Sequence, residues 1–246
     1  MSSSRKFLSR PRPQRRAIFA IFGLALALTV GTASAAGASR DILLDLVTHC
    51  LDAATPDYCG QCRTPRSEAR CGVAEDCRGT TEVWSLDSRY VAVRDRKMCG
   101  CAAGFVHGLA IPREAVRGVE DPARPDGIWQ FAWEVARTRI EAERIALAVN
   151  PARARSQDQL HVHLVRLRPG LAAELDAVAG AAVSDLAAVW RVAAGLAAER
   201  GYADYGVLVV PRATGGFRVV VSPDNPEKAY TEWQCPAAGD DLGRGR

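Results

Sequence analysis

The chain has 246 residues, of which 48% are hydrophobic, enough for one domain with a substantial core or for two small domains. Its net charge of +4 is unevenly placed, because residues 1–35 hold six basic residues and no acidic one. The rest of the chain has 26 basic against 28 acidic residues. This nearly neutral body excludes the strongly basic surface of a nucleic-acid-binding protein.

The first segment, residues 1–35, has the features of a targeting sequence. A basic stretch precedes an uncharged run whose strongly apolar part is short, and Ala33-Ser34-Ala35 offers a small-residue cleavage site. We expect a signal peptide, and the alternative is a retained membrane anchor, because about 20 residues can span a bilayer. Both interpretations place the rest of the chain outside the cytoplasm, in the periplasm or at the periplasmic face of the inner membrane.

The second segment, residues 36–82, is expected to be a helix followed by a cysteine-rich loop region. Apolar residues recur at helical spacing over 40–50, whereas 51–82 is polar and rich in Cys, Gly, Pro and Arg. The eight cysteines of the chain suggest disulfides in an exported protein. A Cys50–Cys235 link would join the first helix to the last segment. Cys59-Gly60-Gln61-Cys62 could instead be half of a zinc site or a redox pair.

The third segment, residues 83–246, alternates strands and helices. Runs at 90–93 and 105–111 predict an antiparallel hairpin with a long loop, in which Cys99 and Cys101 are too close together to pair with each other. An amphipathic pattern predicts a helix over 129–148 that runs into 145–149.

The remaining elements follow the same mixture. We expect a strand over 160–167, a helical region over 172–200 interrupted near Gly180, and a final hairpin in which 206–210 and 217–221 flank Thr214-Gly215-Gly216. Helices mixed with adjacent hairpins indicate an α+β fold with an antiparallel sheet.

The segment at 159–163 carries the strongest chemical signal. His161 and His163 share one face of the predicted strand, opposite Leu160 and its apolar partners. Three interpretations compete: a nucleophilic imidazole acting on phosphorus, a metal site, and two surface histidines on an edge strand. A catalytic zinc normally needs a third protein ligand, which the motif does not supply. Arg153 and Arg155 favour the first interpretation, because guanidinium groups suit phosphate.

The same residues resemble a known family. Asn150, then Arg155-Ser156-Gln157, then His161 and His163, and finally Arg168-Pro169 resemble the histidine-triad motif and, more closely, the bacterial CDP-diacylglycerol pyrophosphatase family. The segments 90–95 and 106–112 are similar to two strands of histidine-triad proteins.

The resemblance implies a histidine-triad-like antiparallel sheet with packed helices, formed by a catalytic domain at 83–246. It also implies hydrolysis of CDP-diacylglycerol to CMP and phosphatidic acid through a nucleotidyl-histidine on His161, near a membrane surface, without a metal or cofactor and with no protein partner indicated. His163 would be the second catalytic histidine. The substrate-binding residues would be Asn150, Arg153, Arg155, Ser156, Gln157 and Gln159, the last in the place of the first histidine.

Two alternatives to this function remain open at the level of sequence. One is an exported hydrolase of another nucleoside-diphosphate conjugate, such as a nucleotide sugar. The other is a disulfide-stapled binding module that has lost activity, although the retained His161 and His163 argue against it.

Overall fold

The computed structural model describes residues 39–51, 82–98, 101–102, 104–177 and 180–235, all of them in a compact unit that spans residues 38–246. The expected leader at 1–35 and the Cys59–Cys62 pair lie outside the described residues, and most of 36–82 does too, so these predictions stay untested. No helix in the described part of the chain is both long and apolar enough to cross a bilayer.

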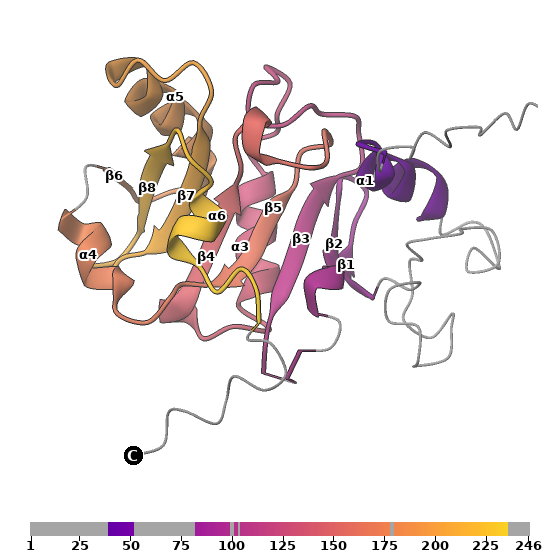
Figure 1. Cartoon of the computed structure of the whole chain (residues 1–246), viewed down its shortest axis with the longest axis horizontal. Coiled ribbons are helices and arrows are strands. Elements are labelled where there is room, and N and C mark those ends of the chain that lie inside the picture. Colours follow the sequence, from indigo (N-terminus) through magenta and orange to yellow (C-terminus); the bar gives the residue numbers. More distant parts are fainter. Residues whose placement is uncertain (1–38, 52–81, 99–100, 103, 178–179, 236–246) are drawn as a thin grey trace, which may run out of the picture. The chain divides into compact units, whose positions relative to one another are not determined.

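The described chain forms one antiparallel sheet of eight strands in the order β1-β2-β3-β5-β4-β7-β8-β6 (Figure 1). The strands are β1 (Val83–Leu86), β2 (Tyr90–Arg94), β3 (His107–Pro112), β4 (Ile145–Val149), β5 (Val162–Arg166), β6 (Ala181–Val183), β7 (Gly206–Pro211) and β8 (Phe217–Ser222). The α+β class with an antiparallel sheet is therefore confirmed.

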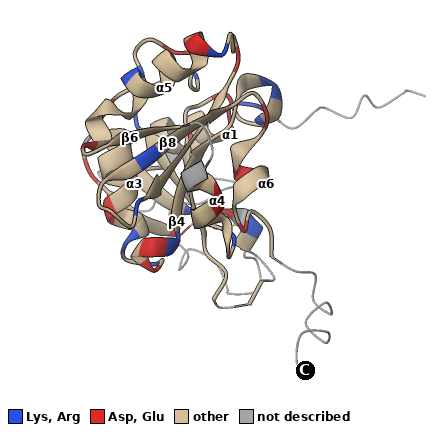
Figure 2. Ribbon diagram, turned by 90° about the vertical axis from the view of Figure 1, so that its left-hand side faces the viewer, with Lys and Arg blue, Asp and Glu red and all other residues tan. Residues whose placement is uncertain are grey.

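The helices lie before, between and after the strands. They are α1 (Ile42–Asp45), continued by the π-helical η1 (Leu46–Cys50), then α3 (Ile128–Ala136), α4 (Leu171–Ala177), α5 (Val189–Glu199) and α6 (Pro226–Tyr230). Single 3₁₀ turns are η3 (Arg96–Met98), η4 (Ala142–Arg144), η5 (Ala152–Ala154) and η6 (Leu186–Ala188). In the view of Figure 2, basic and acidic residues are interspersed over these elements, and residues of one charge do not gather in one region.

Several predicted elements are confirmed and two are wrong. The first helix, the β2–β3 pair, β5 and the β7–β8 hairpin occur where the pattern predicts them. The helix expected over 129–148 ends at Ala136, and 145–149 is strand β4, because a buried central strand with apolar residues at every position has no alternation to distinguish it from a helix. The helical region over 172–200 contains the short strand β6.

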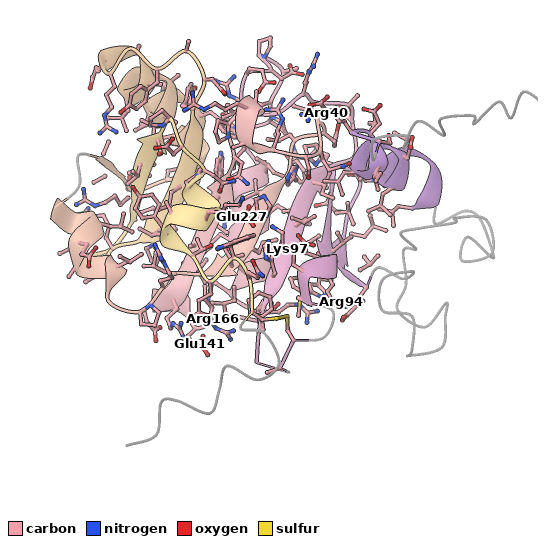
Figure 3. The ribbon with its side chains drawn as sticks, in the orientation of Figure 1. Arg40, Arg94, Lys97, Glu141, Arg166 and Glu227 are labelled. Carbon is pink, nitrogen blue, oxygen red and sulfur yellow. A yellow bond between two sulfur atoms is a disulfide. The ribbon has the colours of Figure 1, made fainter. Side chains whose placement is uncertain are left out.

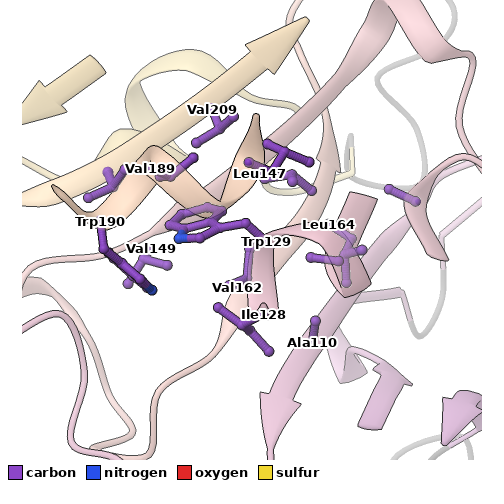
Figure 4. Packing of buried hydrophobic residues seen from close by; sticks show 14 of the residues in the cluster. Ala110, Ile128, Trp129, Leu147, Val149, Val162, Leu164, Val189, Trp190 and Val209 are labelled. Carbon is purple, nitrogen blue, oxygen red and sulfur yellow. The ribbon is translucent and has the colours of Figure 1, made fainter. Parts of the chain in front are cut away.

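One face of the sheet carries a continuous apolar core. Trp129 of α3 and Trp190 of α5 pack with ring centroids 4.7 Å apart over fully buried strand residues such as Leu147 and Leu164 (Figure 4). Burial of two indole rings in one cluster supplies much of the apolar contact area of this layer.

The opposite face is covered in two separate parts. Around β2 and β3, α1 and η1 pack on an apolar cluster that includes Val91 and Leu109. Around β4 and β7, a second cluster that includes Ala148 and Leu208 packs against residues of α4 and α6. We call this face the split face, because its two apolar clusters leave polar residues between them.

A disulfide joins Cys101 to Cys235, 134 residues apart in sequence. The Cys50–Cys235 link expected from the sequence is therefore wrong, because Cys235 has Cys101 as its partner. The prediction that Cys101 forms a disulfide with a cysteine other than Cys99 is confirmed. This bond ties the segment after α6 to the connection between β2 and β3, on the side of the sheet where the histidines lie.

Candidate active site

The alternation along β5 sends its side chains to opposite faces of the sheet. Val162 and Leu164 enter the continuous core, whereas His163 belongs to the split face. There His163 is paired with Leu109 of β3 on one side and with Ala148 of β4 on the other, one residue from each apolar cluster. His161 directly precedes the strand, and its ring centroid lies 4.8 Å from that of His163. The two histidines of the motif thus meet in the gap between the clusters.

His161 is held in one tautomer by the backbone. Its Nδ1 lies 2.8 Å from the carbonyl oxygen of Gln159, and because a carbonyl oxygen can only accept, Nδ1 carries the proton. The lone pair of the neutral ring is then on Nε2. Burial lowers the pKa of His161 below its usual value, so the ring is neutral at pH 7. His161 can therefore act as a nucleophile or as a base through Nε2.

A row of hydrogen bonds fixes His163 and includes His107. Nδ1 of His107 donates to the carbonyl oxygen of Trp233 at 3.2 Å, which leaves its Nε2 to accept from Nδ1 of His163 at 3.0 Å. Nε2 of His163 then accepts from Nδ2 of Asn150 at 3.2 Å. Burial lowers the pKa of His107 to about 3 and that of His163 well below its usual value, so both rings are neutral. Both ring nitrogens of His163 are therefore bound by protein groups.

Charged groups adjoin this row. Glu227 of α6 is 2% exposed, its Oε2 accepts from Nδ2 of Asn150 at 2.6 Å, and its Oε1 accepts from Nζ of Lys97. The carboxylate of Asp95, at the end of β2, lies 3.5 Å from Nε2 of His107, and burial raises the pKa of Asp95. The result is a connected polar network in a largely buried setting, where each satisfied contact is stronger than it would be in water.

Four members of this network had no role assigned from the sequence: Asp95, Lys97, His107 and Glu227. His107 is one of only four histidines in the chain and lies in a predicted strand, so composition offered a signal for it. Asp95 and Lys97 follow directly on a β-prone run. Glu227 offered no comparable signal, because it lies on a five-residue helix that only tertiary packing brings to the histidines.

A cavity of about 220 Å³ ends on this network. One wall is apolar and comes from α1, η1 and the neighbouring strands: Ile42, Leu43, Leu46, Val93 and Leu109. The other wall is polar: Arg94, Asp95, Lys97, Ser156, Gln157, His161 and His163. The cavity is therefore suited to a ligand that has both a charged and an apolar part.

The two loop arginines contact other protein groups. The Arg155 side chain is 3% exposed and forms a paired salt bridge with Glu120, one of whose hydrogen bonds is 2.7 Å long. Arg153 donates to the carbonyl oxygen of Pro223 and lies near Asp224. Neither arginine is among the described residues that line the cavity. Their substrate-binding role stays a prediction.

The other predicted binding residues lie in three different places. Ser156 and Gln157 line the cavity, and Gln157 also accepts from the backbone N–H of Leu43, which links the loop to α1. Asn150 contacts the histidine row. Gln159 instead donates to backbone carbonyls of Pro112 and Glu114 and accepts from the Val116 N–H, so its amide joins the 112–116 segment to the strand rather than facing the cavity.

Asp95, His107 and His163 could together hold a metal ion, since one donor atom from each lies within 4.8 Å of the others. The sequence supplied no third ligand for a site built on the histidine motif, whereas the fold supplies a carboxylate and a further imidazole. Such a mixed nitrogen and oxygen set suits zinc. However, Nε2 of His107 and Nδ1 of His163 already share a hydrogen bond. A bound metal would have to displace that bond, so metal-free chemistry is kept as a prediction.

The fold and this site define an α+β protein whose cavity ends on a neutral, tautomerically fixed histidine. A comparison with protein-family models matches residues 61–203 to the family described as CDP-diacylglycerol pyrophosphatase. Because the match covers more than half of the chain, the protein belongs to this family of phosphoanhydride hydrolases. The match includes both histidines of the motif, whereas α1 and α6, which also border the site, lie outside it.

Proposed function

We propose that the protein hydrolyses the pyrophosphate of CDP-diacylglycerol to CMP and phosphatidic acid, with His161 as the nucleophile. The observation that carries the proposal is the hydrogen bond from Nδ1 of His161 to the Gln159 carbonyl, which leaves an unprotonated Nε2 on a ring that lines the cavity. Family membership supports the substrate. The apolar wall of the cavity is compatible with a substrate that continues into a lipid.

The reaction proceeds by two displacements. Nε2 of His161 attacks the phosphorus of the cytidylyl group, the bond to the bridging oxygen breaks, and phosphatidic acid leaves with that oxygen and its electron pair. Water then attacks the same phosphorus, the P–N bond breaks with its electron pair returning to Nε2, and CMP and a proton are released. Nδ1 keeps its proton and its bond to the Gln159 carbonyl throughout, which stabilises the positive charge of the nucleotidyl imidazole.

The other polar residues support this step in different ways. Ser156 and Gln157 both line the cavity, but the Gln157 amide donates to the carbonyl oxygens of Ser39 and Ser156, so Ser156 is the loop side chain that would contact the phosphate oxygens. His163 has both nitrogens bound within the protein, so it acts by fixing the ring of His161, which it meets at an interplanar angle of 71°.

The substrate is tested with the purified protein, CDP-diacylglycerol, UDP-glucose and ADP-ribose, and measurement of the released nucleotide. We expect CMP from the lipid conjugate and at least tenfold slower release from the other two. Faster turnover of a nucleotide sugar would identify another nucleoside-diphosphate conjugate as the substrate. Absence of turnover with all three would indicate the inactive binding module.

Stereochemistry tests the covalent intermediate. Two inversions at phosphorus give net retention, whereas direct attack by water with His161 as a general base gives a single inversion. A chiral thiophosphate analogue of the CDP group, hydrolysed in isotopically labelled water, distinguishes them. Inversion, with no nucleotidyl adduct after rapid alkaline quench, would remove the covalent mechanism and leave the activity itself unaffected.

A further inference from the structure

The cavity beside His161 needs positive charge to bind a pyrophosphate, and neither loop arginine is among the described residues that line it. Arg155 is engaged by Glu120, and Arg153 lies over the 223–224 backbone outside the cavity wall. Among the described residues that line the cavity, the basic ones are Arg94 and Lys97 (Figure 3). Arg94 lies 3.9 Å from Glu82, whereas Lys97 donates to Glu227, a member of the network that contains the histidines.

Glu227 connects Lys97 to that network. One carboxylate oxygen accepts from the Lys97 ammonium, and the other accepts from Asn150 at 2.6 Å and lies 3.3 Å from Nε2 of His163. The Glu227 side chain is 3% exposed, whereas that of Lys97 is 35% exposed. A buried carboxylate therefore holds a partly exposed ammonium at the boundary between the network and the cavity.

Two further contacts limit where the Lys97 side chain can go. The backbone N–H of Lys97 donates to Asp95 at 2.9 Å, which fixes the start of the 3₁₀ turn η3. The ammonium lies 5.6 Å from the centroid of the Trp233 ring, close enough for a cation–π interaction. The position of this charge is thus set by Asp95, two residues before Lys97, and by Glu227 and Trp233 from the last part of the described chain.

We propose that Lys97 binds the pyrophosphate oxygens of the substrate and that Glu227 is the positioning residue that holds the Lys97 ammonium beside His161. The proposal rests on the proposed function for the identity of the substrate. A lysine ammonium is a point charge that serves phosphate groups of varied orientation. Because the Lys97 ammonium is held in place before the substrate binds, it does not have to reorganise as charge develops on the leaving phosphate. Glu227 lies outside the family-matched segment, so α6 supplies part of the site that the match does not cover.

Lys228 provides a matched control for Lys97. Its ammonium lies over the same Trp233 ring, at 4.9 Å, but Lys228 is not among the described residues that line the cavity. We expect Lys97→Met to lower kcat/KM for CDP-diacylglycerol by about 10²- to 10³-fold, the range for removal of one preorganised charge-stabilising group. Lys228→Met should stay within about twofold of the wild type, and Lys97→Arg should recover part of the loss because it keeps the charge.

A binding measurement separates this proposal from the proposed function. Calorimetric titration of the full chain with inorganic pyrophosphate should show at least tenfold weaker binding in Lys97→Met than in Lys228→Met, whichever conjugate the enzyme hydrolyses. Thermal unfolding of each variant checks that the fold is retained. Equal affinities of the wild type and Lys97→Met would overturn the proposal even if CDP-diacylglycerol hydrolysis is intact.

The role of Glu227 is tested by Glu227→Gln and its pH profile. The charged or titratable groups that act on the His161 ring are Asp95, Lys97, His107, His163 and Glu227. Glu227 favours the protonated ring, so its removal should move the acid limb of kcat/KM to lower pH, and KM should rise because the Lys97 ammonium is no longer held. A uniform loss of activity, with KM and the acid limb unchanged, would overturn the positioning role.

Discussion

The two faces of the sheet are built from the same strands but serve different purposes. On one face, α3 and α5 cover a single apolar cluster in which residues from β2 to β8 are contiguous. On the split face, the apolar cover is divided into one cluster under α1 and another against α4 and α6. The histidine row occupies the space between them. The site therefore lies where the apolar packing on the sheet is interrupted.

The two faces also differ in the kind of side chain that packs on them. The continuous core needs only apolar side chains of adequate volume, which local patterns of hydrophobicity can specify. The gap on the split face instead needs polar partners with matched donors and acceptors. These come from distant segments: Glu227 from α6, the Trp233 carbonyl from the segment after it, and Lys97 from η3, with the Cys101–Cys235 disulfide joining the last two segments.

The largest expected effect is on the split face. His161→Ala should reduce kcat by roughly 10³-fold or more, because removal of a nucleophile leaves only binding and electrostatic contributions. The fold should persist, because the apolar core does not include this ring. Turnover of purified protein and its urea unfolding midpoint are the measurements. Activity above a few per cent of the wild type would show that His161 is not the nucleophile.

The neighbouring strand position should give the reverse pattern. Leu164 is fully buried in the continuous core, one residue from His163. Leu164→Ala should lower the free energy of unfolding by about 2–5 kcal/mol through lost burial and a residual cavity. The folded fraction should keep most of its turnover per molecule. Loss of turnover without loss of stability would contradict the view that this face stabilises the fold and that the split face carries the catalysis.

The sequence predicted the motif residues better than their partners. The alternation around 160–164 placed Leu164 in the core and His163 on the other face, because residue alternation is a local property of a strand. The contacts of His163 with His107 and Asn150 depend on the register of β3, β5 and β4, which no local pattern specifies. Strand β4 is apolar at every position, so no alternation along the chain distinguishes it from a helix.

The charged partners were the least predictable part of the site. Arg155, in a loop that resembles a phosphate-binding segment, is turned toward Glu120 by tertiary packing. Glu227 reaches the histidines because α6 docks closely on the start of β7. Neither outcome follows from spacing along the chain, since both depend on which distant carboxylate or cation the fold brings near.

The packing of α6 against the start of β7 can be weakened at Gly206. A Cβ at this position would lie 2.6 Å from Cδ of Pro226 and 2.7 Å from the carbonyl oxygen of Val149, so α6 or β4 would have to move. Gly206→Ala should cost about 1–3 kcal/mol of stability, as overpacking usually does, and should reduce turnover by displacing Glu227. Gly195→Ala in α5 is the control, because nothing lies within 4 Å of its added Cβ. Equal effects of the two substitutions on turnover would show that α6 does not support the site.

The buried neutral histidines should make stability fall in acid. In the unfolded chain a histidine titrates near 6.5, whereas the folded protein holds the pKa of His107 at about 3. Between these values the unfolded chain binds more protons, so this contribution is complete above about pH 6.5 and is lost as the pH falls toward 3. Each histidine held neutral should contribute a slope of about 1.4 kcal/mol per pH unit. The raised pKa of Asp95 acts in the opposite direction. Urea midpoints that do not change between pH 7 and 5 would contradict neutral burial.

The smallest expected effect is that of metal chelation. It distinguishes a hydrogen-bonded histidine row from a metal site on the split face. Asp95, His107 and His163 could coordinate a metal, but the hydrogen bond of 3.0 Å between the two imidazoles uses the nitrogens that a metal would need. Because the proposed mechanism takes its cation from Lys97 and its nucleophile from the neutral His161, EDTA followed by gel filtration should leave turnover within about twofold of the untreated enzyme. His107→Gln sharpens the result, since it removes one ligand and also breaks the hydrogen-bond row. If EDTA abolishes turnover and zinc restores it in the wild type but not in His107→Gln, the row is a metal site. The polar gap would then be closed by coordination rather than by hydrogen bonds.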